Sequence, residues 1–220
     1  MRKPEMPQKL KWINALVLVI MAIVTIDAIK PFDAWKISPD SPGYGWNKFS
    51  YFTVQSNLIA ATCYLIAAFA IFRKKKLGEW FRYLRGGAVL YMMVTGIVFA
   101  LLLKNTAVNP DPSHFNWSNF VLHEFGPFFI TVWWLLWPSR SPITARESFY
   151  WLLFPFLWVI YTFIRAAMTG WYPYPFLDPD TAGGMVGVST YVVGLTLFFV
   201  ILCQLLAWIS RVRANNYTLY

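Results

Sequence analysis

Two side chains of this sequence could carry out chemistry together. Thr53 and His123 each lie a few residues inside a long apolar stretch. A threonine hydroxyl is a weak nucleophile until a base takes its proton, and neutral imidazole can do this near pH 7. If both stretches are helices that enter a membrane from the same side, the two side chains lie at a similar depth of roughly 6 Å. Thr53 and His123 are therefore the candidate nucleophile and base.

Polar neighbours accompany each member of the pair. Thr53 is followed closely by Gln55, Ser56 and Asn57, and Asn119 lies one helical turn before His123. Polar side chains inside a membrane are costly and normally face the interior of a helix bundle. Such residues also hydrogen-bond across helices in ordinary packing, so they identify the inward faces more firmly than they identify chemistry.

Three charged residues are expected in the same outer layer. Asp27, Glu124 and Arg165 lie near the ends of apolar stretches on that side. Any of them could orient the histidine or contact a substrate carboxylate. Glu124 and Arg165 could equally extend to the lipid headgroups as interfacial residues. Both interpretations stay open from the sequence.

A metal centre is not expected. The chain has two histidines, His114 and His123, and no second histidine or cysteine at ligand spacing from the latter. Cys63 and Cys203 fall inside apolar stretches, where buried thiols serve as small packing residues. We expect no metal and no other cofactor.

Six apolar stretches are each long enough to cross a bilayer and must position these residues. A spanning helix needs about 20 mostly apolar residues, because the hydrocarbon core is roughly 30 Å thick. The stretches cover residues 12–29, 49–72, 86–103, 120–137, 149–167 and 185–209. With 58% hydrophobic and 13% charged residues, the chain cannot coat a soluble domain of its size. The sequence predicts an all-α polytopic membrane protein with one domain of six transmembrane helices.

Basic residues set the expected orientation. Of the 19 lysines and arginines, 14 fall at the two termini and in the second and fourth connections. Cytoplasmic segments retain such residues, so both termini are predicted to be cytoplasmic. The basic run from Arg73 to Lys76 is expected to contact anionic headgroups. This distribution argues against a nucleic-acid partner despite the net charge of +9.

The second stretch has two distinct faces. Small and polar residues recur by threes and fours along one face: Thr53, Ser56, Asn57, Ala60, Tyr64, Ala67 and Ala68. The opposite face suits lipid and consists of Val54, Leu58, Ile66, Phe69 and Phe72. In the fourth stretch, one face carries Asn119, His123, Gly126, Pro127 and Thr131.

A proline- and tyrosine-rich connection, residues 171–179, follows the fifth stretch and is called the strap below. Its prolines fix φ and prevent helix continuation. We expect the strap to pack across the outer mouth of the bundle, either as a stiff interfacial cap or as a lid over a cavity.

These features resemble a known family. Six spans, a Tyr51-Phe52-Thr53 start to the second span and an Asn119…His123 start to the fourth are similar to the androgen-induced and androgen-dependent transmembrane proteins. Those proteins are intramembrane threonine hydrolases that cleave fatty acid esters of hydroxy fatty acids. The Gln55-Ser56-Asn57 run and the strap look more like the family's bacterial relatives. The resemblance covers the topology of nearly the whole chain and is specific around the second and fourth spans.

The resemblance implies an acyl-transfer mechanism. Its nucleophile falls on Thr53 and its histidine on His123, with a membrane lipid or fatty-acyl ester as substrate. The side-chain amides of Gln55 and Asn57 are candidate donors to the oxyanion. Two other functions stay open, a non-catalytic lipid-binding or scaffold protein and a small-molecule transporter. The sequence does not specify the oligomeric state, and we expect the bacterial cytoplasmic membrane as the location.

Overall fold

The computed structural model describes residues 7–104, 115–139 and 141–213, and in these residues the chain is helical without any β-strand. Five of the described helical segments are long and apolar enough to cross a membrane. They are Gln8–Asp33, Phe52–Phe72, Trp80–Leu103, Ala145–Thr169 and Gly184–Val212. The prediction of an all-α chain with several membrane-spanning helices is confirmed at this level.

Long α-helices form the body of these segments, and some are extended by short helical turns. The long helices are α1 (Gln8–Ile29), α3 (Phe52–Phe72), α4 (Trp80–Val98), α8 (Leu153–Thr169) and α10 (Gly184–Val212). Beyond α1 and α4 lie a 3₁₀ turn, η1 (Pro31–Asp33), and a π-helical turn, η2 (Phe99–Leu103). Before α8 lie α7 (Ala145–Ser148) and a 3₁₀ turn, η4 (Phe149–Leu152).

The fourth predicted stretch is helical but irregular. It consists of α5 (Trp117–Asn119), the π-helical η3 (Phe120–Phe125) and α6 (Gly126–Leu136), which follow one another without a gap. Pro127 has no N–H to donate, so the carbonyl one turn earlier, that of His123, lacks its usual helical partner. A π-helical turn that ends two residues before the proline is one way for a helix to absorb this loss.

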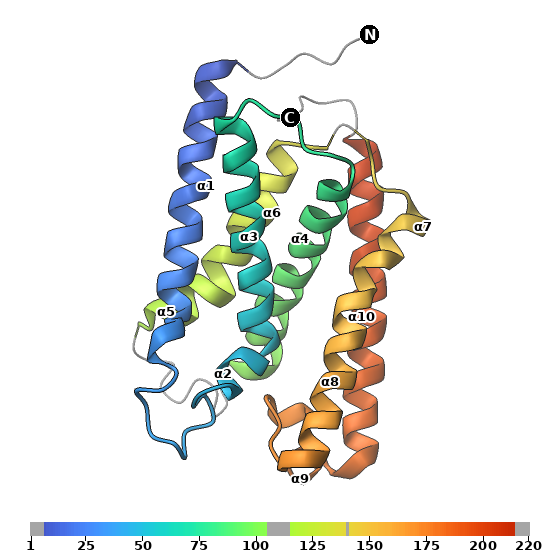
Figure 1. Cartoon of the computed structure of the whole chain (residues 1–220). Helices are drawn as coiled ribbons and strands as arrows, with labels where there is room; N and C mark the ends of the chain where they lie inside the picture. Colours follow the sequence, from blue (N-terminus) through green and yellow to red (C-terminus); the bar gives the residue numbers. More distant parts are fainter. Residues whose placement is uncertain (1–6, 105–114, 140, 214–220) are drawn as a thin grey trace.

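Figure 1 shows two groups of helices. α1, α3, α4 and α6 lie together, and α8 and α10 run roughly parallel to each other at the right of the view. The start of α1, the end of α3 and the end of α10 lie at one end of the molecule, at the top of Figure 1, which we call the basic end because it includes the run from Arg73 to Lys76. The short helices α2 (Asn47–Ser50) and α9 (Pro179–Ala182) lie at the opposite end.

The two predicted faces of α3 are largely as the sequence indicated. All seven members of the small and polar face are buried. Phe69 and Phe72 on the other face are exposed. Val54 is a correction, because it is only 6% exposed and packs with Ala28 and Ile29 at the end of α1. The lipid-facing stripe of α3 therefore does not reach the first turn of the helix.

A glycine allows α7 and η4 to pack closely on α4. A Cβ atom at Gly86 would lie 2.1 Å from the indole of Trp151. The indole N–H of Trp151 donates to the carbonyl of Tyr83 over 2.9 Å, and the hydroxyl of Tyr91 donates to the carbonyl of Trp151 over 2.8 Å. A larger residue at position 86 would displace Trp151 and disrupt these two hydrogen bonds between η4 and α4.

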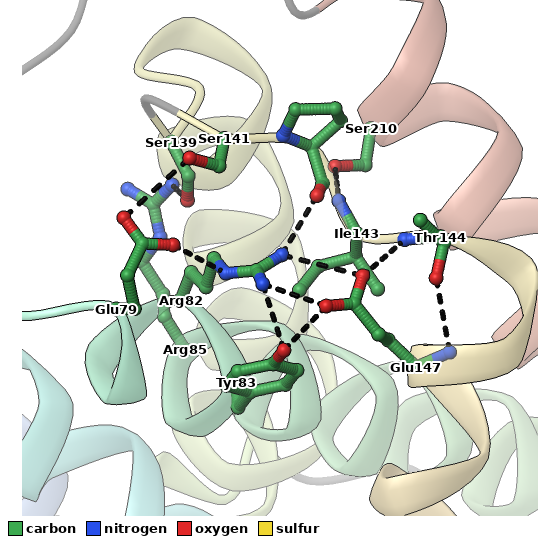
Figure 2. A network of polar contacts seen from close by, with 11 residues as sticks. Glu79, Arg82, Tyr83, Arg85, Ser139, Ser141, Ile143, Thr144, Glu147 and Ser210 are labelled. Carbon is green, nitrogen blue, oxygen red and sulfur yellow. Dashed lines mark hydrogen bonds and ion pairs between the residues drawn. The ribbon is translucent and has the colours of Figure 1, made fainter.

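A polar network closes the basic end, and Figure 2 shows Arg82 at its centre. The guanidinium of Arg82 lies 2.7 Å from a carboxylate oxygen of Glu147 and 2.8 Å from Glu79. Glu147 also accepts from the Tyr83 hydroxyl over 2.5 Å and belongs to the capping box that starts α7 with Thr144. These contacts hold α7, and with it the start of the fifth predicted span, against α4.

Candidate active site

Thr53 lies in the first turn of α3 with its hydroxyl inside the bundle. The helix begins at Phe52 because Tyr51 has an extended backbone, with ψ of 133°. Thr53 is 8% exposed, and so is His123. The Oγ1 atom of Thr53 lies 3.3 Å from Nε2 of His123, which η3 carries. The structure thus brings the two residues within hydrogen-bond distance from two different helical segments.

The surroundings of His123 define which ring nitrogen carries the proton. Its Nδ1 lies 3.3 Å from the carbonyl oxygen of Asn119, and a carbonyl can only accept. Nδ1 therefore carries the hydrogen, and Nε2 presents a lone pair toward Thr53. This is the tautomer that a general base needs in order to take the hydroxyl proton.

Both π-helical turns contribute to the position of His123. The ring of Phe99, in η2, stacks on the imidazole with centroids 4.0 Å apart and an angle of 17°. Gly96 of α4 lies against the His123 backbone, since a Cβ there would come within 2.9 Å of the His123 carbonyl oxygen. π-helical turns occur frequently at functional sites, where they redirect a side chain.

Ser56 and Asn57 hold the backbone of Thr53 in place. The Ser56 hydroxyl donates to the Thr53 carbonyl over 3.0 Å and lies 2.8 Å from the hydroxyl of Thr95 on α4. The side-chain amide of Asn57 donates to the carbonyls of Thr53, over 2.9 Å, and Leu122, over 3.1 Å. Asn57 therefore connects the helix of Thr53 directly to the turn that carries His123.

The side-chain amides of Gln55 and Asn57, expected as oxyanion donors, are bonded to backbone carbonyls instead. The amide of Asn57 already donates to two carbonyls, and that of Gln55 donates to the Phe49 carbonyl over 2.9 Å. Gln55 lies on a different face of α3 from Thr53, so its side chain extends back toward α2. Neither amide points to the hydroxyl of Thr53.

The charged residues of the outer layer also lie away from the pair. A carboxylate oxygen of Asp27 accepts from the indole N–H of Trp117 over 2.9 Å. The guanidinium of Arg165 donates to the side-chain oxygen of Asn47 and lies 4.5 Å from the ring centre of Trp171. Glu124 is exposed. The group that orients His123 is instead the backbone carbonyl of Asn119, which sequence reasoning had noted only for its place on the same helix face.

Tyr174, in the strap, completes the surroundings of Thr53. Its hydroxyl oxygen lies 3.2 Å from both the backbone nitrogen and Oγ1 of Thr53. Burial raises the pKa of the Tyr174 hydroxyl above its ordinary value, so the group stays protonated and able to donate. The sequence identified the strap as a cover, but it gave no sign of which of its tyrosines would reach Thr53.

The strap packs closely against the helices. Its residues Pro173, Tyr174, Phe176 and Leu177 are buried, the last three around the 3₁₀ turn η5 (Pro175–Leu177). The rings of Tyr174 and Phe176 stack with centroids 5.2 Å apart and an angle of 7°. The expectation that this segment packs across the bundle is met in the structure.

An apolar cavity of about 650 Å³ begins at Thr53 and Tyr174. Its walls come from α4, α8 and α10 and include Val94, Val98, Leu153, Phe156, Leu195 and Phe199. Leu153 and Phe156 are also exposed, so the cavity opens sideways along α8. The cavity follows α8 and η4 from Val159 to Phe149 over about 15 Å, which is close to half the hydrocarbon thickness of a bilayer.

Comparisons with known proteins add no identity to this geometry. The chain matches no protein-family model, no curated protein and no solved structure. The function is therefore argued from the site and its cavity.

Proposed function

We propose that this chain is a multi-pass membrane hydrolase of lipid esters, with Thr53 as nucleophile and His123 as general base. One observation carries the proposal. The contacts from Asn119 through His123 to Thr53 form a chain with a single consistent direction of donation, and that chain ends at the wall of an apolar cavity. This arrangement is suited to acyl transfer from a substrate with a long hydrocarbon chain.

The proposed reaction has two halves. His123 Nε2 takes the hydroxyl proton while Thr53 Oγ1 bonds to the ester carbonyl carbon, and the carbonyl oxygen becomes negative. The tetrahedral intermediate then expels the alcohol, which receives the proton from His123, and leaves an acyl-threonine. Water attacks this ester, giving its proton to His123. Collapse releases the fatty acid and returns the proton to Thr53 Oγ1.

The cavity supports a substrate with an acyl chain of roughly single-leaflet length. Its walls along α4, α8 and α10 are almost entirely apolar, apart from hydroxyls such as that of Thr95. Fatty acid esters of hydroxy fatty acids, which the family resemblance implies, and similar lipid esters have the required chemistry. Because the cavity opens along α8, the substrate would enter from the bilayer.

The proposal includes a specific topology. The helical run 117–136 would be a sixth transmembrane segment, with both termini on the cytoplasmic side of a bacterial membrane and the run from Arg73 to Lys76 near anionic headgroups. Single-cysteine labelling from outside the cell should modify Phe115→Cys and leave Leu77→Cys unlabelled. The reverse pattern would overturn the orientation.

The catalytic part is tested by ester hydrolysis with the purified protein in lipid vesicles. Thr53→Ala, His123→Ala and the double variant should share a similar residual rate, because loss of either group already disables the same step. Thr53→Ser should retain measurable activity. Thr62→Ala removes an exposed hydroxyl from the same helix and should behave as the unmodified protein.

Non-catalytic lipid binding is the second candidate, since the cavity alone would serve it. Full hydrolysis by a folded Thr53→Ala protein would contradict the nucleophile, and an absence of hydrolysis with retained lipid binding would favour the binding function. A transporter would instead move solute across sealed vesicles independently of Thr53.

A further inference from the structure

Hydrogen-bond directions around Thr53 leave one role for the hydroxyl of Tyr174. The backbone N–H of Thr53 donates to the Tyr174 oxygen, because a backbone nitrogen cannot accept. The hydroxyl proton of Thr53 is directed to His123 Nε2. Oγ1 of Thr53 therefore accepts the remaining hydrogen bond, which the Tyr174 hydroxyl donates over 3.2 Å.

We propose that Tyr174 is the oxyanion donor of this site, and this inference rests on the proposed hydrolase function. The tetrahedral oxygen that becomes negative is bonded to the same carbon as Oγ1, so it forms two bonds away from the atom to which Tyr174 already donates. During attack, Oγ1 uses a lone pair to form the new bond to carbon. The Tyr174 hydroxyl keeps its proton and can redirect its hydrogen bond from Oγ1 to the adjacent oxyanion. The donor is thus present before the charge develops.

The contact from the Thr53 amide strengthens this donor. A hydroxyl oxygen that accepts one hydrogen bond becomes a better donor in the next, because the two bonds polarise each other. The amide belongs to the first turn of α3, where the helix leaves its N–H groups without intrahelical partners. Thr53 N–H, Tyr174 O–H and the oxyanion would form one continuous chain.

Packing holds the Tyr174 ring in place for this task. Besides its stack with Phe176, the ring lies 5.6 Å from that of Tyr51 and 6.0 Å from that of Trp158. Pro173 and Pro175 on either side restrict the backbone. A donor fixed in this way needs little reorganisation when the charge appears, which is the condition for strong electrostatic stabilisation.

Other donors are poorly placed to replace it. The side-chain amides of Asn57 and Gln55 are bonded to backbone carbonyls, and the Ser56 hydroxyl donates to the carbonyl of Thr53. Each of these groups would have to give up its present hydrogen bond to reach the oxyanion, and for Ser56 and Asn57 that bond is buried. Tyr174 needs only to redirect its proton.

The matched variants Tyr174→Phe and Tyr172→Phe test the inference. Both remove one hydroxyl from the strap and keep the ring. Tyr174→Phe should lower kcat for a long-chain p-nitrophenyl ester by about 10²–10³, with KM changed little. Tyr172→Phe should keep the original kcat. Thermal unfolding in detergent should show that both variants are folded.

A tetrahedral-adduct inhibitor separates oxyanion stabilisation from a structural role. An alkyl trifluoromethyl ketone forms an oxyanion on the nucleophile and should bind Tyr174→Phe more weakly by a factor close to the fall in kcat. A non-hydrolysable alkyl ether of the same length should bind both proteins equally. Equal weakening of both ligands would mean that Tyr174 only shapes the cavity, and this would overturn the inference.

The outcomes distinguish this inference from the function on which it rests. If Thr53→Ala abolishes hydrolysis while Tyr174→Phe retains the original kcat, Thr53 stands as nucleophile and Tyr174 is not the oxyanion donor. If Thr53→Ala and Tyr174→Phe both hydrolyse esters at the original rate, the proposed function fails and the inference fails with it. The inference is supported if kcat falls in Tyr174→Phe but not in Tyr172→Phe, and if Tyr174→Phe loses affinity for the ketone but not for the ether.

Discussion

At the scale of single residues, the site depends on where the proton of Thr53 can go. The Thr53 hydroxyl faces the lone pair of His123 Nε2, because the carbonyl of Asn119 holds the imidazole in one tautomer. Ser56 and Asn57 both donate to the carbonyl of Thr53, so this residue is fixed through its backbone as well as its side chain. The contacts of Thr53 with His123, Ser56 and Asn57 are buried, where an unsatisfied polar group is costly.

Asn57 offers a test of this support. Replacement by Ala removes two hydrogen bonds, to the carbonyls of Thr53 and Leu122, and should lower the free energy of unfolding by about 1–3 kcal/mol. Hydrolysis should fall as well, because α3 and η3 lose their direct connection. Chemical denaturation and ester hydrolysis, measured on the same preparation, check both effects. A variant as stable and active as the Thr62→Ala control would show that these two hydrogen bonds support neither the fold nor the site.

At the scale of helices, the irregular segments around the site matter more than the regular ones. The π-helical turns η2 and η3 carry Phe99 and His123, whose rings stack on each other. Pro127 lies two residues after the end of η3, and it offers no backbone N–H to the carbonyl of His123. The position of the base is thus linked to a proline one turn away.

Restoring the missing donor should move the base. Pro127→Ala allows an N–H at position 127 to bond to the carbonyl of His123 and so favours a regular α-helix through η3. A displacement of His123 by about 1 Å would be enough to lower kcat roughly 10²-fold, while thermal stability is kept or raised. Steady-state kinetics with a parallel thermal melt measures this. Unchanged kcat in a stable Pro127→Ala protein would show that the proline does not set the geometry of the base.

The sequence predicted the regular elements and their faces better than it predicted the site's third group. Helical spacing placed Thr53, Asn57 and the other small and polar residues on the buried face of α3, because burial follows the period of the helix. It failed for Val54, where the end of α1 covers a residue expected to face lipid. Tyr174 could not be found in this way, because an irregular strap has no period from which the direction of a side chain follows.

Over the whole molecule, the cavity depends on how α8 and α10 are held beside the other helices. At the basic end the connection includes the network in Figure 2, where Arg82 of α4 meets Glu147 of α7. At the opposite end the strap joins α8 to α10 and packs on Tyr51 through Tyr174. Between these two ends, Leu153 and Phe156 of α8 line the cavity and are exposed at the same time.

The network in Figure 2 can be weakened without disturbing the helix cap. Glu147→Gln removes the charge but keeps an oxygen for the backbone N–H of Thr144. The pair with Arg82 is partly buried, so its loss should lower the free energy of unfolding by about 1–3 kcal/mol. The effect should be clearly smaller in an Arg82→Met background, where only the hydrogen bond from Tyr83 to Glu147 is still affected, and a double-mutant cycle by thermal unfolding would measure the difference. Equal losses in both backgrounds would mean that Arg82 is not the partner that matters.

The central claim, that Thr53 is an acylated nucleophile, is tested most directly by mapping the residue that an alkyl fluorophosphonate modifies. The purified protein in lipid vesicles is treated with the probe, digested and analysed by mass spectrometry. We predict one adduct, on Thr53, that is absent from Thr53→Ala and strongly reduced in His123→Ala. An adduct on another residue, or hydrolysis that continues at the original rate in protein whose Thr53 is fully modified, would contradict this role.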